Sequence, residues 1–123
     1  MATTTATLTL SSADLTGDAL ALSTTATLTK AGTLTGLSQT TGVGRKTTTA
    51  TSQYILFDGD AYANGSHKVY LKNTSAVATE FLTIEINSEQ MGKLYAGDWA
   101  LLPFNGDQDI KITPSVATDM VVE

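Results

Sequence analysis

Cysteine is absent from this chain, and histidine and tryptophan each occur once among 123 residues. Without cysteine there are no disulfide bonds and no thiolate metal ligands, and a single histidine excludes a metal centre built on a histidine pair. Charged residues make up 15% of the chain, against roughly 25% in an average protein. Either threonine hydroxyls supply the wetted surface or neighbouring molecules cover part of it. We favour partial cover, with assembly adding stability.

Basic residues and long apolar runs are also scarce. The net charge is −5 and the isoelectric point is near 4.6, which argues against a nucleic-acid-binding surface, because such a surface neutralises phosphates with clustered Lys and Arg. No apolar run approaches the length of a membrane span. The opening Met1–Thr4 lacks the features of a secretory signal. We therefore expect neither a nucleic-acid nor a membrane partner.

Threonine and the aromatic residues divide the chain into two parts. Residues 1–52 hold 18 of the 23 threonines and none of the eight aromatic side chains. Within them, Thr5–Leu10 (TATLTL) recurs as Thr25–Lys30 (TATLTK). This alternation has a period of two and predicts strands with Thr on one face and Leu or Ala on the other. At this length we expect a single domain overall. Its core is formed by residues 53–123, and the Thr-rich strands or arm of residues 1–52 belong to the same fold or reach a neighbour.

Short alternating segments separated by polar turns predict the strands of this fold. No window of ten residues has a helical repeat. We expect a break at Ser88–Gly92, and Pro103 at a strand end or sheet edge. The pattern predicts an all-β protein of about eight short strands, an antiparallel β-sandwich of jelly-roll type, with a barrel as the alternative. The predicted strands are Thr3–Leu10, Ala19–Lys30, Thr33–Leu37, Lys46–Phe57, Lys68–Lys72, Phe81–Ile86, Trp99–Leu102, Asp109–Thr113 and Ala117–Val122.

The bulky apolar side chains of the second part are the candidate core. Two of the core candidates, Trp99 and Phe104, could instead join Tyr70 and Tyr95 in a sugar-stacking platform. We expect core use of Trp99 and Phe104, because the chain has few aromatic residues with which to fill an interior. The predicted core residues are Val69, Leu71, Leu82, Ile84, Ile86, Trp99, Leu101, Phe104, Ile110 and Ile112.

Three short patterns resemble functional motifs but fail on spacing. In a calcium loop starting at Asp58, the sixth position is Ala63 instead of Gly and the twelfth is Val69 instead of Glu. His67 has no nucleophile-elbow Gly-x-Ser-x-Gly to act with, so we expect it to cap a strand or lie at a subunit contact. Gly42–Lys46 matches no phosphate-binding loop. Because none of these motifs is complete, we expect no catalytic, cofactor-binding or metal-binding residues, and we expect that the protein is not an enzyme.

Two further features are interpreted as structural or as contacts. Arg45 and Lys46 are adjacent cations in an acidic chain, and we predict that they contact an acidic partner surface. Asn64-Gly65-Ser66 and Asn73-Thr74-Ser75 match the glycosylation acceptor pattern. No secretory signal supports glycosylation, and we expect both segments to be turns.

Several segments of the chain match a pattern found in one group of proteins. Lys68–Ser75 (KVYLKNTS) is a strand followed by a turn, and Leu94–Pro103 follows the pattern L-x-x-G-[DE]-[FW]-A-x-x-P. Asp109–Ile112 and Val116–Val122 close the chain with alternating residues. Together with the Thr-rich opening through Ser38, these segments resemble small structural proteins of tailed bacteriophages, especially those that infect aquatic bacteria. The resemblance spans most of the chain and rests on architectural motifs.

The resemblance implies a virion component that is made in the host cytoplasm and carries no active site. It implies a capsid decoration (cement) protein on the capsid exterior, which binds the major capsid protein, stabilises the shell and forms a homotrimer. A tail, collar or fibre component is an alternative within the same group. A carbohydrate-binding β-sandwich module is a further alternative, suggested by the tyrosine and tryptophan content.

Overall fold

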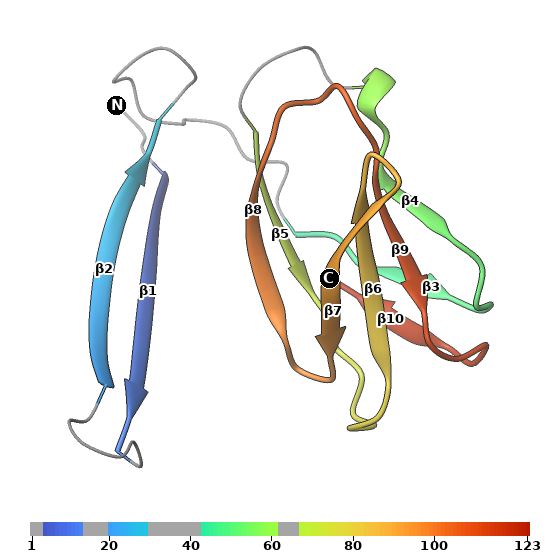
Figure 1. Ribbon diagram of the computed structural model, residues 1–123, viewed down its shortest axis with the longest axis horizontal. Helices are drawn as coiled ribbons and strands as arrows, with labels where there is room; N and C mark the ends of the chain where they lie inside the picture. Colours follow the sequence, from blue (N-terminus) through green and yellow to red (C-terminus); the bar gives the residue numbers. More distant parts are fainter. Residues whose placement is uncertain (1–3, 14–19, 30–42, 62–66) are drawn as a thin grey trace. The chain divides into compact units, whose positions relative to one another are not determined.

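The computed structural model describes residues 4–13, 20–29, 43–61 and 67–123. These residues form ten strands and one short 3-10 helix, and every strand pairing is antiparallel (Figure 1). The all-β prediction is confirmed, with about ten strands instead of eight. The chain divides into two compact units, unit 1 (Met1–Gly42) and unit 2 (Val43–Glu123). Among the described residues, no helix is long and apolar enough to cross a membrane.

Unit 1 contains the N-terminal sheet, which consists of β1 (Thr4–Ser12) and β2 (Leu20–Leu28). The two strands pair without a register shift, from Thr4 opposite Leu28 to Ser12 opposite Leu20. Both were predicted, and β1 continues through Ser11 and Ser12, beyond the predicted end at Leu10. The predicted strand Thr33–Leu37 lies outside the described residues.

The two faces of the N-terminal sheet differ as the alternation predicts. Seven of the eight paired residues on one face carry a hydroxyl group, and Thr7 Oγ1 lies 2.9 Å from Thr25 Oγ1 across the strands. The opposite face, here called the leucine face, carries the apolar side chains. Its apolar members are Ala6, Leu8, Leu10, Leu20, Leu22, Ala26 and Leu28.

Unit 2 contains eight strands arranged in three sheets (Figure 1). A four-stranded sheet has the order β4-β9-β6-β7, and two pairs, β5-β8 and β3-β10, form separate two-stranded sheets. Pro103 lies in β8, which has a single partner strand, in agreement with its predicted edge position. The strands are β3 (Lys46–Thr48), β4 (Tyr54–Phe57), β5 (His67–Lys72), β6 (Phe81–Ile86), β7 (Glu89–Tyr95), β8 (Trp99–Phe104), β9 (Ile110–Pro114) and β10 (Met120–Val122).

Two predicted boundaries are wrong. The segment Lys46–Phe57 is two strands in different sheets, because the chain turns between them, where the Thr49 N–H donates to the Tyr54 hydroxyl at 3.2 Å. The break after β6 is the two-residue turn Asn87-Ser88, with φ angles of 54° and 62°, and the expected break at Ser88–Gly92 is mostly strand. Two successive residues with positive φ are typical of a type I′ hairpin turn, whose twist matches that of the flanking strands.

The position of β3 bears on how the chain divides. The prediction separated residues 1–52 from residues 53–123, whereas unit 2 begins at Val43. β3 lies before residue 53 and pairs with β10 at the other end of the chain, from Lys46 opposite Val122 to Thr48 opposite Met120. This pairing places β3 within the C-terminal fold.

The core of unit 2 consists of two clusters of buried apolar side chains. The first joins the β5-β8 pair to the four-stranded sheet, and the second joins β10 to the same sheet. Seven predicted core residues are buried, and Ile86 packs against the first cluster while partly exposed. The first cluster contains Val69, Leu71, Ile84, Leu94, Phe104 and Ile110, and the second contains Leu82, Ile112, Met120 and Val122.

The core prediction fails at Trp99 and Leu101, which are 51% and 43% exposed. Successive side chains of a strand point to opposite faces, so residues 99 and 101 cannot share a face with Phe104. Phe104 is buried, and Ala100 and Leu102 pack on the same core cluster. The two bulkier neighbours therefore lie on the outside of β8.

Asn73 is a fully buried polar residue at the end of β5. Its Nδ2 donates to the carbonyl oxygens of Glu80 (3.2 Å) and Leu94 (3.0 Å), and its Oδ1 accepts from the Ser75 N–H (3.0 Å). Its backbone N–H donates to the backbone carbonyl oxygen of Asp98 at 3.0 Å. The side-chain amide therefore joins the end of β5 to β7 and to the segment before β6, and the backbone N–H of the same residue joins it to the segment before β8.

We predict that Asn73→Ala lowers the free energy of unfolding by about 3 kcal/mol, because it leaves buried carbonyl groups without a donor. Asn105→Ala is the matched control, since the Asn105 amide bonds to Asp107 within an exposed turn. The control should cost less than about 1 kcal/mol. Urea unfolding followed by Trp99 fluorescence measures both values, and equal losses would contradict the role given to Asn73.

We also predict that Ser88→Gly raises the free energy of unfolding by about 0.5–1 kcal/mol, because glycine adopts a positive φ without the steric cost of a Cβ atom. Ser88→Val should have the opposite effect, since a β-branched residue tolerates this conformation poorly. Thermal unfolding of the three proteins tests the order. A less stable glycine variant would show that the turn is not strained at Ser88.

Candidate functional site

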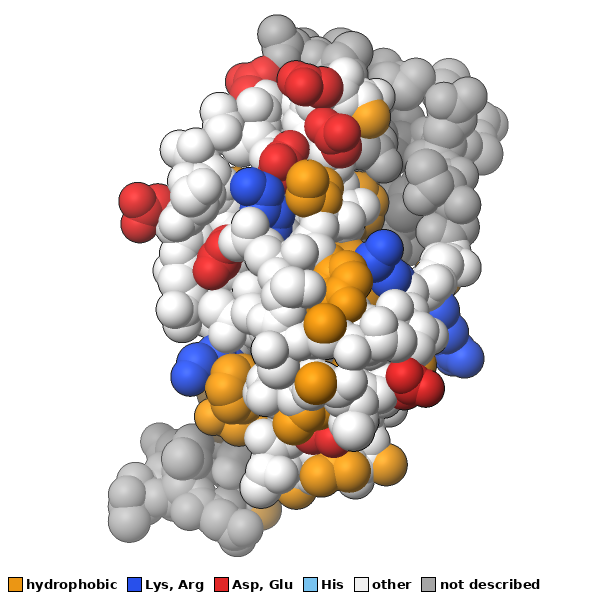
Figure 2. All heavy atoms as spheres, turned by 90° about the vertical axis from the view of Figure 1, so that its right-hand side faces the viewer, with side chains coloured by type: hydrophobic (Ala, Val, Ile, Leu, Met, Phe, Trp, Pro, Cys, Tyr) orange, Lys and Arg blue, Asp and Glu red, His pale blue; other side chains and the backbone are white. Residues whose placement is uncertain are grey.

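The acidic residues near η1 (Gly59–Ala61) form hydrogen bonds that hold a turn. Asp58 Oδ1 accepts from the Asp60 N–H, and Asp109 Oδ1 accepts from the Gly59 N–H, both at 2.9 Å. Acidic side chains gather at this end of unit 2 (Figure 2). Across the described residues, no group of three or more His, Asp and Glu side chains could hold a metal ion. The acidic end is therefore explained as local structure.

The three cationic or titratable candidates from the sequence each make contacts within unit 2. His67 begins β5, and its ring lies 6.0 Å from the ring of Phe104. Arg45 pairs with Glu123 at 3.3 Å, and Lys46 Nζ lies 5.5 Å from the ring centre of Tyr54. Contact of Arg45 and Lys46 with a partner remains a prediction.

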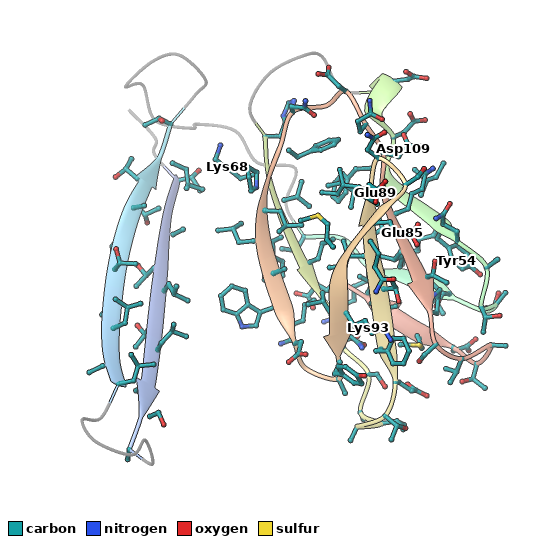
Figure 3. All side chains as sticks on the ribbon, in the orientation of Figure 1. Tyr54, Lys68, Glu85, Glu89, Lys93 and Asp109 are labelled. Carbon is teal, nitrogen blue, oxygen red and sulfur yellow. The ribbon has the colours of Figure 1, made fainter. Side chains whose placement is uncertain are left out.

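The hydroxyl of Tyr54 has a perturbed environment. The Thr49 N–H donates to it at 3.2 Å, and this hydrogen bond lowers the pKa of Tyr54 below the usual tyrosine value. Tyr54 lies on β4, whereas Glu85, Glu89 and Lys93 lie along β6 and β7 (Figure 3). None of these groups forms a constellation of nucleophile, base and orienting residue of the kind that catalysis needs.

The outer face of β5-β8 is the candidate functional site. Val69 and Leu71 point into the core, so the alternate residues of β5 point outward, and Lys68 lies on the side of β5 away from the four-stranded sheet (Figure 3). The strand register opposes Lys68 to Pro103, Tyr70 to Leu101 and Lys72 to Trp99. This face thus combines four apolar or aromatic side chains with two lysines.

The aromatic residues of this face lie close enough to act together. The rings of Tyr70 and Trp99 are 6.5 Å apart and inclined at 32°, and Tyr70 is 40% exposed. Exposed Tyr and Trp side chains offer a flat apolar surface with a hydrogen-bonding group at its edge. Such a surface suits ligands that present both apolar surface and hydrogen-bonding groups. Lys68 and Lys72 add positive charge to this face of an acidic chain.

The alternative of a platform of four aromatic residues is not one surface in the structure. Phe104 is buried beneath β8. Tyr95 lies on β7, where its ring is 5.3 Å from Phe81, and Lys93 Nζ sits 4.3 Å from the Phe81 ring centre. Only Tyr70 and Trp99 come together. Leu101 and the two lysines of this face were not predicted as site residues, although their alternation with Val69, Leu71 and Phe104 carries that signal.

The two glycosylation patterns fare differently. The Nδ2 atom of Asn73 is buried and donates to two carbonyl groups, which leaves it no room for a glycan. Asn64-Gly65-Ser66 lies outside the described residues.

A comparison with known protein families, curated proteins and solved structures gives no match for this chain.

Proposed function

We propose that unit 2 is a jelly-roll sandwich. Its eight strands pair in a nested order, with β6-β7 innermost, then β5-β8, β4-β9 and β3-β10. Lys72 and Glu123 exchange two backbone hydrogen bonds of 2.9 Å, which link β5 to the residue after β10 and favour one layer of order β3-β10-β5-β8. The four-stranded sheet is the facing layer. Eight strands in two such sheets are the arrangement of jelly rolls, which occur in viral capsid proteins and in lectins.

We propose that the protein is a non-enzymatic bacteriophage virion protein, most specifically a capsid decoration protein. The observation that carries this proposal is the division between the units. Unit 2 has its own core, whereas the N-terminal sheet is an exposed, uncharged pair of strands. A long strand pair without charge is suited to binding another β-structure through its backbone. The resemblance of Lys68–Ser75 and Leu94–Pro103 to phage structural proteins supports the same function.

In this function the protein binds the major capsid protein on the outside of the shell as a trimer, with no nucleic-acid or membrane partner. Contacts spread over many copies stabilise a shell by mass action. A position in the tail, collar or a fibre is the alternative within the virion. Immunogold labelling of intact virions separates the capsid from these locations.

We predict that the purified protein binds capsids that lack it and saturates at a fixed number of copies per particle. Bound capsids should resist heating better than bare capsids, because a ligand that binds only the assembled state stabilises it. Cosedimentation and thermal opening of the particles measure the two effects. Failure to bind, together with equal heat resistance of capsids with and without the protein, would contradict the proposal.

Carbohydrate binding is a second candidate function, favoured by the exposed Tyr70–Trp99 pair. In that case the protein is retained on a glycan array, and Trp99→Ala weakens retention by about tenfold through loss of ring stacking. Tyr95→Ala is the control, because Tyr95 is equally accessible but lies on β7. Both variants should keep the unfolding midpoint of the original protein in far-UV circular dichroism. Equal retention of all three proteins would exclude the Tyr70–Trp99 pair as a sugar site.

A further inference from the structure

The N-terminal sheet buries little of its own apolar surface. Leu10, Leu20 and Leu22 on the leucine face are 43–44% exposed. A sheet of two strands is marginally stable in water unless its apolar face is packed against something else. The leucine face therefore requires a cover to be stable.

The edges of this sheet lack the features that usually prevent strands from pairing with other molecules. β1 and β2 pair over nine residues each with no register shift, and neither strand contains a charged residue or a proline. Edge strands of unit 2 do carry such features: Lys46 in β3, a register shift in β4, Glu89 in β7 and Pro103 in β8. Charges, prolines and bulges at edges oppose intermolecular pairing. β1 and β2 lack these features, and among the residues that the structure describes no third strand pairs with either outer edge.

The sequence of the two strands indicates which partner fits these edges. Thr5-Ala6-Thr7 of β1 already pairs with Thr25-Ala26-Thr27 of β2, so the repeated motif is complementary to itself. The outer edge of β1 in one copy can meet the outer edge of β2 in another in the same way. Leucines then stay on one side of the joined sheet, and most of the hydroxyl groups lie on the other. Because β1 and β2 contain no charged residues, these strands do not repel each other between copies, and they have no ion-pair partner for a charged surface.

We infer that copies of this chain associate through the N-terminal sheet, by edge pairing of β1 with β2 of a second copy and with the leucine faces turned inward between copies. Such head-to-tail pairing closes into a ring when its rotation allows. The inference concerns the isolated chain and does not depend on capsid binding.

Adjacent residues of β2 provide a matched test in the full-length protein. Leu22 lies on the leucine face and Ser23 on the hydroxyl face. Leu22→Lys places a charge between copies and should raise the dissociation constant for self-association at least about tenfold, because an inward-pointing charge replaces a leucine that association would bury. Ser23→Lys adds the same charge one residue away, on the solvent side, and should change that constant by less than about threefold. Sedimentation equilibrium at several protein concentrations measures both.

A second variant guards against misfolding of the lysine variant. Leu22→Thr introduces an uncharged β-branched residue that favours strands, and it should weaken association in the same direction as Leu22→Lys because it removes apolar surface. Trp99 lies in unit 2, so an unchanged fluorescence unfolding curve shows that this unit stays folded in every variant. A protein that is monomeric at all concentrations would overturn the inference. Equal weakening by Leu22→Lys and Ser23→Lys would also overturn it.

Discussion

The buried amide of Asn73 is the interaction on which the arrangement of unit 2 depends. It donates to carbonyl groups before β6 and in β7, and its own backbone forms a bridge to Val122 in β10. Segments far apart in the sequence thus meet at one residue, through its side chain and its backbone. A buried amide with two donors and an acceptor specifies this meeting more narrowly than an apolar residue, because any other arrangement leaves polar groups without partners. The two apolar clusters add to the free energy of unfolding by burying apolar surface.

The two units follow opposite physical strategies. Unit 2 joins its two-stranded sheets to the four-stranded sheet through two clusters of buried apolar side chains, and its edges carry charges, a proline or a bulge. Unit 1 has a sheet without charges and with half-exposed leucines. The first strategy suits a fold that stands alone, and the second suits an element completed by contact with another molecule. The proposed self-association and the proposed capsid binding both rest on that difference.

The outer face of β5-β8 shows where reasoning from the sequence succeeded and where it failed. Alternation placed Val69 and Leu71 inside correctly, and the same period applied to β8 separates Trp99 and Leu101 from Phe104. The prediction failed because it assigned the few aromatic residues of the chain to the interior, which made Trp99 a better core candidate than the small Ala100. The alternation of side chains along a strand decides which residues face the core, and the size of a side chain cannot override it. The largest aromatic residue consequently became part of the candidate site.

The amino-acid sequence alone determined the all-β class, the two-faced Thr-rich strands and most of the core. These properties follow from a period of two and from composition, both of which are local. Tertiary structure alone decided that β3 pairs with β10, that Lys46–Phe57 divides into two strands, and that Asn73 becomes a buried junction. It also brought Tyr70 and Trp99 together on one outer face. Such outcomes depend on pairing between residues distant in sequence, and local alternation has no information about which strand edge another strand will meet.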